Sequence, residues 1–428
     1  MIKKLKYADF IVRDYLTNSD RAQGIAGVVA DILADVSRRG DEALFEYGKR
    51  FDNCELSSLE VTDEEIKAAT EMAGAEFLGV MERAARNIEE FHRRQVRYGY
   101  VMNRESGVTL GQLILPLERV GLYIPGGTAV YPSTVLMNCI PAKLAGVKEL
   151  ILTTPPSPDG SVDSGIMAAA KLAGADRIFK VGGAQAIAAM AFGTQTVPRV
   201  DKIVGPGNEY VAEAKRQVFG ITGIDIIAGP SDICIIADEA SADAALIAAD
   251  MLSQCEHGKT SRAVLATNSS GLAERVGVEI EAQLKDLPRY EMARAAIDNN
   301  SVIVITNSIE QAFDVSNELA PEHLEIFLNS PFDWLYKVKN AGSVFLGKHT
   351  PEALGDYYAG TNHTLPTSGT ARFSSPLSVD DFTKKTSFTY YSEDALAAAA
   401  SDVATFAERE GLRAHALSIL KRTDEGMK

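Results

Sequence analysis

From residue 118 to residue 347, short apolar segments alternate with alanine-rich stretches, and this alternation constrains the fold more than any other feature. The apolar segments read ERVGLYI, KELILTT, DRIFKV, VDKIVG, DICIIAD, RAVLAT, SVIVIT and GSVFLG. Their length is typical of buried strands, and the stretches between them have helical patterns. Strands that alternate with helices form βαβ units, so the sequence predicts an α/β fold with parallel sheets.

A local repeat supports this prediction. The segments KLAGVKEL, from Lys143, and KLAGADRI, from Lys171, each contain a glycine between a helical pattern and an apolar run. We expect Gly146 and Gly174 to end their helices in the left-handed conformation. The spacing of the two copies is about the length of one βα unit, as in successive turns of a Rossmann-like domain.

Both ends of the chain have helical patterns. The predicted helices cover residues 19–39, with Ser19 or Asp20 as N-cap and Gly40 after the end, residues 76–97, and residues 392–409. A shorter helical run after Gly411 contains His415.

The composition excludes several classes of protein. The chain has 428 residues, of which 46% are hydrophobic and 24% charged, enough for two or three domains. A net charge of −15 argues against a nucleic-acid partner. No apolar run reaches membrane-spanning length, and charged residues interrupt the first segment, so we expect a cytoplasmic protein without a membrane partner. Widely spaced cysteines without a CxxC motif predict reduced thiols at Cys54, Cys139, Cys234 and Cys255.

Phosphate-binding motifs are absent from the sequence. There is no GxGxxG, and the segment that ends in Gly258-Lys259-Thr260 is not a P-loop because Ser253 stands in the place of its first glycine. Glycine turns at residues 126–127, 182–183 and 205–208 precede helical patterns, where free N–H groups favour phosphate. Tight βα loops explain the same glycines equally well, and the pattern leaves both interpretations open.

The histidines are concentrated in the second half of the chain, with five of six beyond residue 250. Gln254 and His257 end a helical run that begins near Asp243, and their spacing places both on one face, where they could bind one metal ion. The alternative is a histidine at the negative end of a helix dipole beside a solvated glutamine.

Two loops combine carboxylates with imidazoles. Glu322 and His323 are expected in a loop after a helix that ends near Ala320-Pro321, where the pair suits proton transfer or serves only as a cap and a loop hydrogen bond. The glycine-bounded loop Gly355–His363 contains Asp356, a hard oxygen ligand or an Asx-turn acceptor.

Across nearly its whole length the chain resembles the histidinol dehydrogenases. The motifs that carry the resemblance are GLYIPGGTAVYPSTVLMN, GGAQAIAAMAFGT, VDKIVGPGNEYVAEAKR, GIDIIAGPS, LSQCEH, LAPEHLEI, GDYYAGTNHTLPTSGTARFSSPLSVDDF and EGLRAHA. So many matches in order exclude coincidence.

The resemblance implies a zinc- and NAD-dependent homodimer that oxidises L-histidinol through an aldehyde to L-histidine, a four-electron reaction. One Zn²⁺ per subunit is expected on Gln254, His257, Asp356 and the partner subunit's His415, where it orients the substrate. His323 is the expected general base for the hydride steps, and Glu322 is expected to activate water. The implied substrate contacts are Ser231, Gln254, His257, His323, Asp356, His363, Glu410 and His415. The implied NAD contacts are Tyr123, Gln185 and Asn208.

The resemblance also implies incomplete Rossmann-like domains, in keeping with the missing GxGxxG. We therefore expect an α/β chain with two such parallel-sheet domains, a helical N-terminal region and a small helical arm. The expected parts are residues 1–105 (helical), 106–230 (NAD-binding), 231–375 (zinc and catalytic residues) and 376–428 (the arm that contributes to the partner's site).

Two departures from the family pattern bear on the substrate. Cys255 replaces a more usual alanine, and Gly258–Arg262 is more basic than the corresponding run in many relatives, so a relative that oxidises another alcohol, such as a sulfonated diol, is the main alternative. A zinc hydrolase would need an open metal position and no NAD. A non-catalytic assembly protein would not need Glu322 and His323. A thiol nucleophile at Cys255 is disfavoured, because a helical residue between two ligand positions faces away from them.

Overall fold

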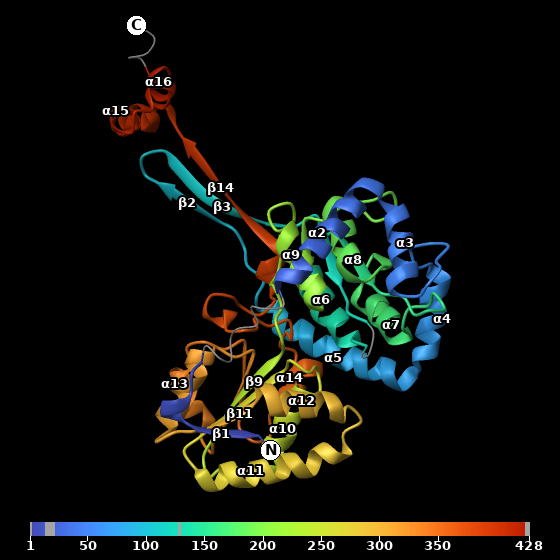
Figure 1. Cartoon of the computed structure of the whole chain (residues 1–428). Coiled ribbons are helices and arrows are strands. Elements are labelled where there is room, and N and C mark those ends of the chain that lie inside the picture. The colour runs from blue at the N-terminus through green and yellow to red at the C-terminus, as the bar shows by residue number, and fades with distance from the viewer. Residues whose placement is uncertain (1, 13–21, 127–129, 424–428) are drawn as a thin grey trace. The chain divides into compact units, whose positions relative to one another are not determined.

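The structure is a computed structural model that describes residues 2–12, 22–126 and 130–423. It forms two compact units, one made of Met1–Gln95 and Leu117–Phe382 and the other of Val96–Pro116 and Thr383–Lys428 (Figure 1). The expected N-cap at Ser19 or Asp20 and the expected turn residue Gly127 lie outside the described residues. The predicted domain boundaries at residues 105, 230 and 375 remain predictions.

The first unit contains a five-stranded parallel sheet in the order β6-β5-β4-β7-β8. Its strands are β4 (Arg119–Tyr123), β5 (Glu149–Thr154), β6 (Arg177–Lys180), β7 (Lys202–Val204) and β8 (Gly223–Ile224). In chain order this is the sequence 3-2-1-4-5, which is the Rossmann order without its sixth strand. The expected incomplete Rossmann-like domain is therefore confirmed.

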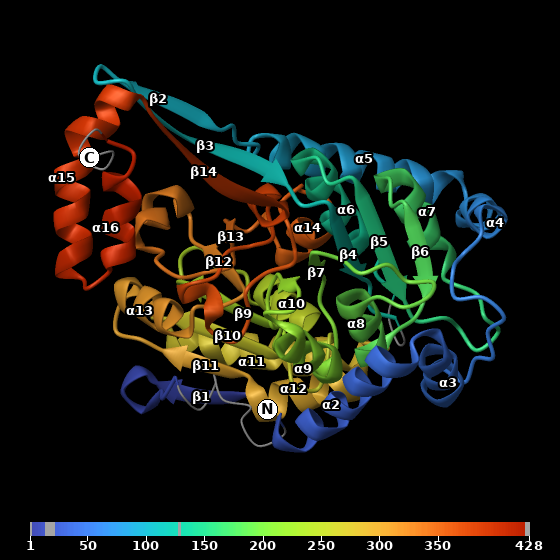
Figure 2. The ribbon, with the colours of Figure 1, turned by 90° about the horizontal axis from the view of Figure 1, so that it is seen from above.

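Helices cover both faces of this sheet (Figure 2). On one face Val120 and Leu122 pack with α4 (Asp63–Ala73), α5 (Ala75–Arg93), α6 (Pro132–Ala145) and α7 (Ser164–Ala173). On the other face Tyr123 and Ile151 pack with α2 (Ala22–Arg39), α3 (Asp41–Phe51), α8 (Gly183–Phe192) and α9 (Glu209–Val218). Successive residues of a strand face opposite ways, so β4, β5, β6 and β7 each contribute to both hydrophobic clusters.

The predicted left-handed glycines end their helices as expected. Gly146, after α6, has φ 90° and ψ 20°, and Gly174, after α7, has φ 77° and ψ 37°. Each N–H binds carbonyl groups of the last helical turn, which satisfies groups that the helix itself leaves free. The repeat seen in the sequence is thus one structural unit used twice.

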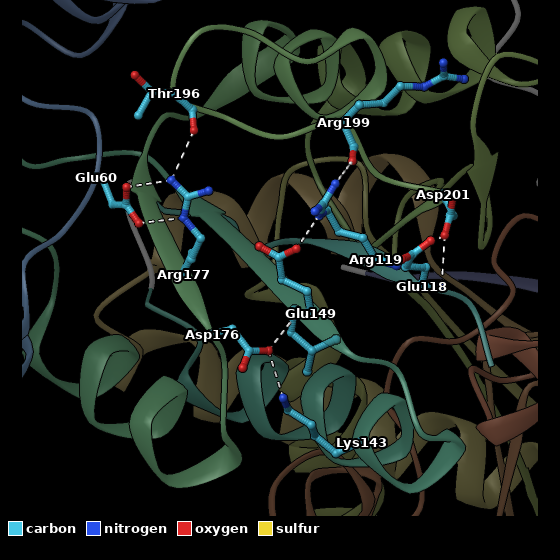
Figure 3. Close-up of polar contacts among 11 residues, drawn as sticks. Glu60, Glu118, Arg119, Lys143, Glu149, Asp176, Arg177, Thr196, Arg199 and Asp201 are labelled. Atoms are coloured by element: carbon cyan, nitrogen blue, oxygen red, sulfur yellow. Dashed lines mark hydrogen bonds and ion pairs between the residues drawn. The ribbon is translucent and has the colours of Figure 1, made fainter.

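Charged side chains pair at the amino ends of the first sheet's strands (Figure 3). Arg177, the first residue of β6, forms two hydrogen bonds of 2.7 Å with the Glu60 carboxylate. Arg119 of β4 binds Glu149 of β5 at 2.5 Å. These ion pairs link neighbouring segments at the amino edge of the sheet, and they do not occupy its carboxyl edge.

The first unit also contains a six-stranded parallel sheet in the order β1-β11-β10-β9-β12-β13. Its strands are β1 (Lys3–Lys6), β9 (Asp232–Ala237), β10 (Arg262–Thr267), β11 (Val302–Ile305), β12 (His323–Phe327) and β13 (Ser343–Leu346). From β9 onward the order again follows the Rossmann pattern, and β1 is added at one edge. The prediction that the chain begins with helices is wrong for residues 3–6, because pairing with β11 makes them a strand.

The helices of the second sheet also lie on both of its faces. One face is covered by α10 (Ala244–Cys255), α11 (Ser270–Gln283) and α12 (Tyr290–Asn300), and the other by α13 (Ile309–Leu319). Asp243 caps α10 by accepting from the N–H of Ala245, as the predicted start near this residue requires. No helix in the described part of the chain is long and apolar enough to cross a membrane.

The second unit combines an antiparallel sheet with two helices. The sheet order is β14-β3-β2, formed by β2 (Tyr100–Arg104), β3 (Val108–Pro116) and β14 (Thr383–Tyr391). Two helices, α15 (Glu393–Arg409) and α16 (Arg413–Leu420), pack side by side, as Figure 2 shows. Both helices were expected, and Ser392 caps α15 by accepting from the N–H of Ala395. The expectation of a purely helical arm missed β14, and the expected helical region of residues 1–105 missed β2, because both strands depend on pairing with β3.

Candidate functional site

Glu322, His323 and Asp232 meet at the amino ends of β9 and β12. These two strands are neighbours in the second sheet, as Figure 2 shows. The Asp232 carboxylate accepts from the N–H of Glu322 at 2.7 Å, and the Glu322 carboxylate accepts from the N–H of Asp232 at 3.1 Å. His323 is the first residue of β12, so its expected place in a loop is wrong. Pairing with β9 extends the strand to the histidine and fixes its backbone.

The ring of His323 has a defined orientation. Its Nδ1 lies 3.2 Å from the carbonyl oxygen of Asp232, an acceptor, so Nδ1 carries the proton of this hydrogen bond. Its Nε2 lies 3.5 Å from a carboxylate oxygen of Asp356. This orientation leaves Nε2 facing the other functional side chains.

The Glu322 and His323 side chains are both buried, which changes their acidity. Burial raises the pKa of Glu322 to about 8, and the charge of His323 opposes this rise. Burial would lower the pKa of His323, but the carboxylates of Glu322 and Asp356 raise it to about 10. Perturbed groups of this kind, side by side, are typical of sites that move protons.

Beside this pair, His257, Glu352 and Asp356 form a group that can hold a metal ion. One ligand atom from each lies within 4.8 Å of the others. Asp356 was expected in a loop, and this expectation is wrong. It lies in a short helix, α14 (Glu352–Tyr357), whose helical turn includes Gly355 and Asp356. His257 lies two residues beyond the end of α10 rather than on the helix.

Gln254 adds an unusual feature to this group. The side chain is fully buried, and within the described structure neither its Oε1 nor its Nε2 has a hydrogen-bond partner. An unpaired buried amide is costly, and an amide oxygen is a suitable ligand for a cation. The predicted residues Gln254, His257 and Asp356 therefore fit a metal site.

Glu352 was not predicted from the sequence. Its spacing of four residues from Asp356 was the available signal, because on a helix this spacing places two carboxylates on one face. The Glu352 carboxylate accepts from the Ser253 hydroxyl at 2.7 Å. Burial raises the pKa of Glu352 to about 7, against the effect of His323.

His363 connects this site to the first sheet. Its Nδ1 lies 3.0 Å from the Asp356 carbonyl oxygen, and its Nε2 lies 3.0 Å from the hydroxyl of Thr134 in α6. Both ring nitrogens thus have partners within the chain, so the contact of His363 with substrate stays a prediction. Ser231 lies just before β9, where its carbonyl accepts from the N–H of Arg262.

Two expected site residues belong to the second unit. Glu410 is the residue that follows α15, and His415 lies in α16. Both are exposed on that unit. Their roles stay predictions.

A cavity of about 1290 Å³ lies at the carboxyl ends of the first sheet's strands. All three expected NAD contacts line it: Tyr123 ends β4, Gln185 lies in the first turn of α8, and Asn208 caps α9. The Tyr123 hydroxyl accepts from the N–H of Gly183, which ties β4 to the start of α8. The amino ends of two helices thus border a space of dinucleotide size.

Comparison with known proteins assigns the chain to a family. The family model described as histidinol dehydrogenase matches residues 16–423. The chain belongs to the histidinol dehydrogenase family. The histidinol dehydrogenase of Clostridium acetobutylicum is 52% identical over 398 residues, covering 93% of this chain and 92% of that protein. That of Streptococcus mutans is 50% identical over 420 residues, covering 98% of each chain.

A solved structure gives the same result for the fold. The crystal structure of histidinol dehydrogenase from Elizabethkingia anophelis matches with a TM-score of 0.90 and 38% identity, covering 96% of this chain and 95% of that one. The predicted histidinol dehydrogenase fold, with its parallel sheets, is confirmed.

Cys255, whose thiol was disfavoured as a nucleophile from the sequence, lies in the protein core. Cys255 is fully buried, and its Sγ is 3.6 Å from the Ser301 hydroxyl. Burial raises the pKa of the Cys255 thiol to about 12. A thiol held in this state is a poor nucleophile at neutral pH.

Proposed function

We propose that the chain catalyses the NAD-dependent oxidation of L-histidinol to L-histidine through a bound aldehyde. The observation that carries the proposal is the Glu322–His323 pair, buried beside the cluster of His257, Glu352 and Asp356. The pair supplies two groups that exchange protons, and the cluster supplies a place for a metal ion. Membership of the histidinol dehydrogenase family names the substrate.

The first role is that of His323 as the base for the alcohol. Since Nδ1 is held by the Asp232 carbonyl, Nε2 is the atom that takes the hydroxyl proton while hydride leaves for NAD. Glu322, whose backbone is fixed by Asp232, then takes a proton from the water that attacks the aldehyde, while the protonated His323 returns its proton to the aldehyde oxygen. The resulting hydrate loses a second hydride to a second NAD, and His323 accepts its proton.

A zinc ion on Gln254, His257, Asp356 and the partner subunit's His415 would bind and orient the substrate. The unpaired amide of Gln254 supports this ligand set. A cation at Asp356 would also offset the carboxylate that raises the pKa of His323, which favours the neutral imidazole that a base requires. The shared ligand makes the proposed enzyme a homodimer.

The cavity at the first sheet is the proposed NAD site, with Tyr123, Gln185 and Asn208 as contacts. Ser231, His363 and Glu410 are the proposed further contacts to the substrate. The cytoplasmic location stays a prediction.

The test is the amount of NADH formed per L-histidinol consumed. We expect two NADH per histidine, loss of turnover when a chelator removes the metal, and recovery when zinc is restored. One NADH with release of aldehyde would contradict the four-electron scheme. If the protein oxidised another alcohol but not L-histidinol, that alcohol would replace L-histidinol as the proposed substrate.

The alternative of an anionic substrate, such as a sulfonated diol, loses support at Arg262. This side chain is buried at the start of β10, and the charge of Asp232 acts on it. A guanidinium buried there is largely withdrawn from the solvent from which an anionic substrate would arrive. Of the two basic residues in Gly258–Arg262, only Lys259 is exposed and could contact an anionic substrate.

A further inference from the structure

Glu325 is a carboxylate in the interior of the second parallel sheet. It is the third residue of β12, is 3% exposed, and lies beside Ile235 of β9 and Phe345 of β13. A carboxylate in such surroundings costs folding free energy unless it has specific partners. The proton-transfer roles of Glu322 and His323 do not involve it, so its partners indicate a separate role.

The alternation of the strand shows which way Glu325 points. His323, Glu325 and Phe327 share one face of β12, and Phe327 packs with Met251 and Leu252 of α10. Glu325 therefore lies beneath α10, the helix whose last turn contains Gln254. One strand face thus carries the proposed base at its start and Glu325 two residues later.

Glu325 shares a side-chain hydrogen bond with Asp250 of α10, and its other partner is the start of α14. Its Oε1 accepts from the backbone N–H of Glu352 at 2.9 Å, and this hydrogen bond is buried. Glu352 is the first residue of α14, and the N-cap residue, Pro351, provides no side-chain acceptor. Glu325 thus satisfies a free N–H group of α14, as a capping side chain would.

We propose that Glu325 is a positioning residue that holds α14 against β12 and α10, and so sets Asp356 at the place that zinc binding requires. The inference rests on the proposed zinc site. A helix of six residues has little stability of its own, and its start is fixed by two contacts, the Glu325 carboxylate and the Ser253 hydroxyl. Loss of the first contact frees the N–H of Glu352 and allows Asp356 to shift away from His257.

The experiment measures zinc affinity of the metal-free, full-length protein by competition with a chromophoric chelator. Glu325→Gln keeps an oxygen that accepts from the N–H of Glu352, whereas Glu325→Met has similar size and no acceptor. We expect the glutamine variant to bind zinc within about threefold of wild type and the methionine variant to bind about 10–100-fold more weakly, as when residues that support metal ligands are changed. Glu291→Met, on the exposed start of α12, is the matched control and should bind as wild type.

A structural defect alone would not give this pattern. Circular dichroism and thermal unfolding of the metal-free variants show whether Glu325→Met is folded. If it is not, Glu325→Asp, which shortens the side chain by one methylene, replaces it, with weaker zinc binding expected. Since Glu325 is proposed to act through Asp356, Glu325→Met should weaken zinc binding little further in an Asp356→Asn background; additive losses would contradict the inference.

The same series separates this inference from the zinc site on which it depends. Weak zinc binding by Asp356→Asn, together with wild-type binding by folded Glu325→Met, would overturn the role of Glu325 alone. Wild-type zinc binding by Asp356→Asn would overturn the proposed zinc site itself.

Discussion

Lys215 and Asp225 form a buried ion pair that holds the backbone of Gly205 from two sides. The ammonium of Lys215 donates to the carbonyl of Gly205 at 2.9 Å and also binds the Asp225 carboxylate. The other oxygen of Asp225 accepts from the N–H of Gly205 at 2.8 Å. Both side chains are almost fully buried, and the turn that they fix leads to Asn208 at the proposed NAD site.

Lys215→Met should destabilise the protein by about 3–5 kcal/mol, because it leaves the carboxylate of Asp225 buried without its charged partner. Urea unfolding measures the effect. The double variant Lys215→Met, Asp225→Leu should regain part of the loss, since no unpaired charge remains. A single variant as stable as wild type would show that the pair contributes little.

His323→Asn and Glu322→Gln should separate the two oxidations. His323→Asn should reduce hydride transfer from both alcohol and aldehyde, by about 10²–10⁴-fold, because it removes the base of both steps. Glu322→Gln should spare alcohol oxidation and block aldehyde oxidation, because it removes the base that activates water. Single-turnover assays that start from histidinol and from the aldehyde measure the two steps. Equal losses in both steps for Glu322→Gln would refute the division.

Asp52, which lines the large cavity, should make stability depend on pH. Burial raises the pKa of Asp52 to about 6, above the unfolded value, so the folded protein binds this proton more tightly. Relative to Asp52→Asn, the wild type should therefore lose stability as pH rises from about 4 to about 6. Because the group is partly exposed, the difference at pH 7 is on the order of 1 kcal/mol. Unfolding midpoints across this range test it, and a constant difference between the two proteins would contradict it.

Cys255→Ala should retain full activity. The thiol packs against Ser301 in the core and takes no part in the proposed proton transfers. Its removal should cost about 1 kcal/mol of stability through lost packing. Turnover well below that of the folded wild type would revive a catalytic role for the thiol.

The sequence predicts the regular part of this fold well. Short apolar runs, glycines such as Gly146 and caps such as Asp243 and Ser392 act locally, so their effect can be read without the tertiary structure. The strand β1 is different, because only pairing with β11, far along the chain, makes residues 3–6 a strand.

The position of the candidate site could not be predicted from strand order. In doubly wound sheets ligands bind at the carboxyl ends of the strands, and the cavity of the first sheet follows this rule. His323 instead stands at the amino end of β12, beside the start of β9. The family motifs identified Glu322, His257 and Asp356 as site residues. That Glu322 contacts Asp232, and that Glu352 lies beside His257, could not be predicted, because these contacts join segments distant in the sequence.

Subunits with different defects should restore each other if the active site is shared. A His415→Asn chain lacks the ligand that a subunit gives to its partner, and a His257→Asn chain lacks one of its own. In a heterodimer, one site then combines an intact His257 with the partner's intact His415, while the other site lacks both. Random exchange makes about half of the dimers heterodimers, so about a quarter of wild-type activity should return from two inactive proteins.

The mixing experiment requires proof that subunits exchange, which differently tagged chains and co-purification provide. Two copies of the His257→Asn chain, mixed in the same way, form the control and should stay inactive. No recovery in spite of proven exchange would mean that His415 is not shared between subunits, and the zinc ligands would then have to come from one chain, with Glu352 beside His257 and Asp356 as the candidate for the missing ligand.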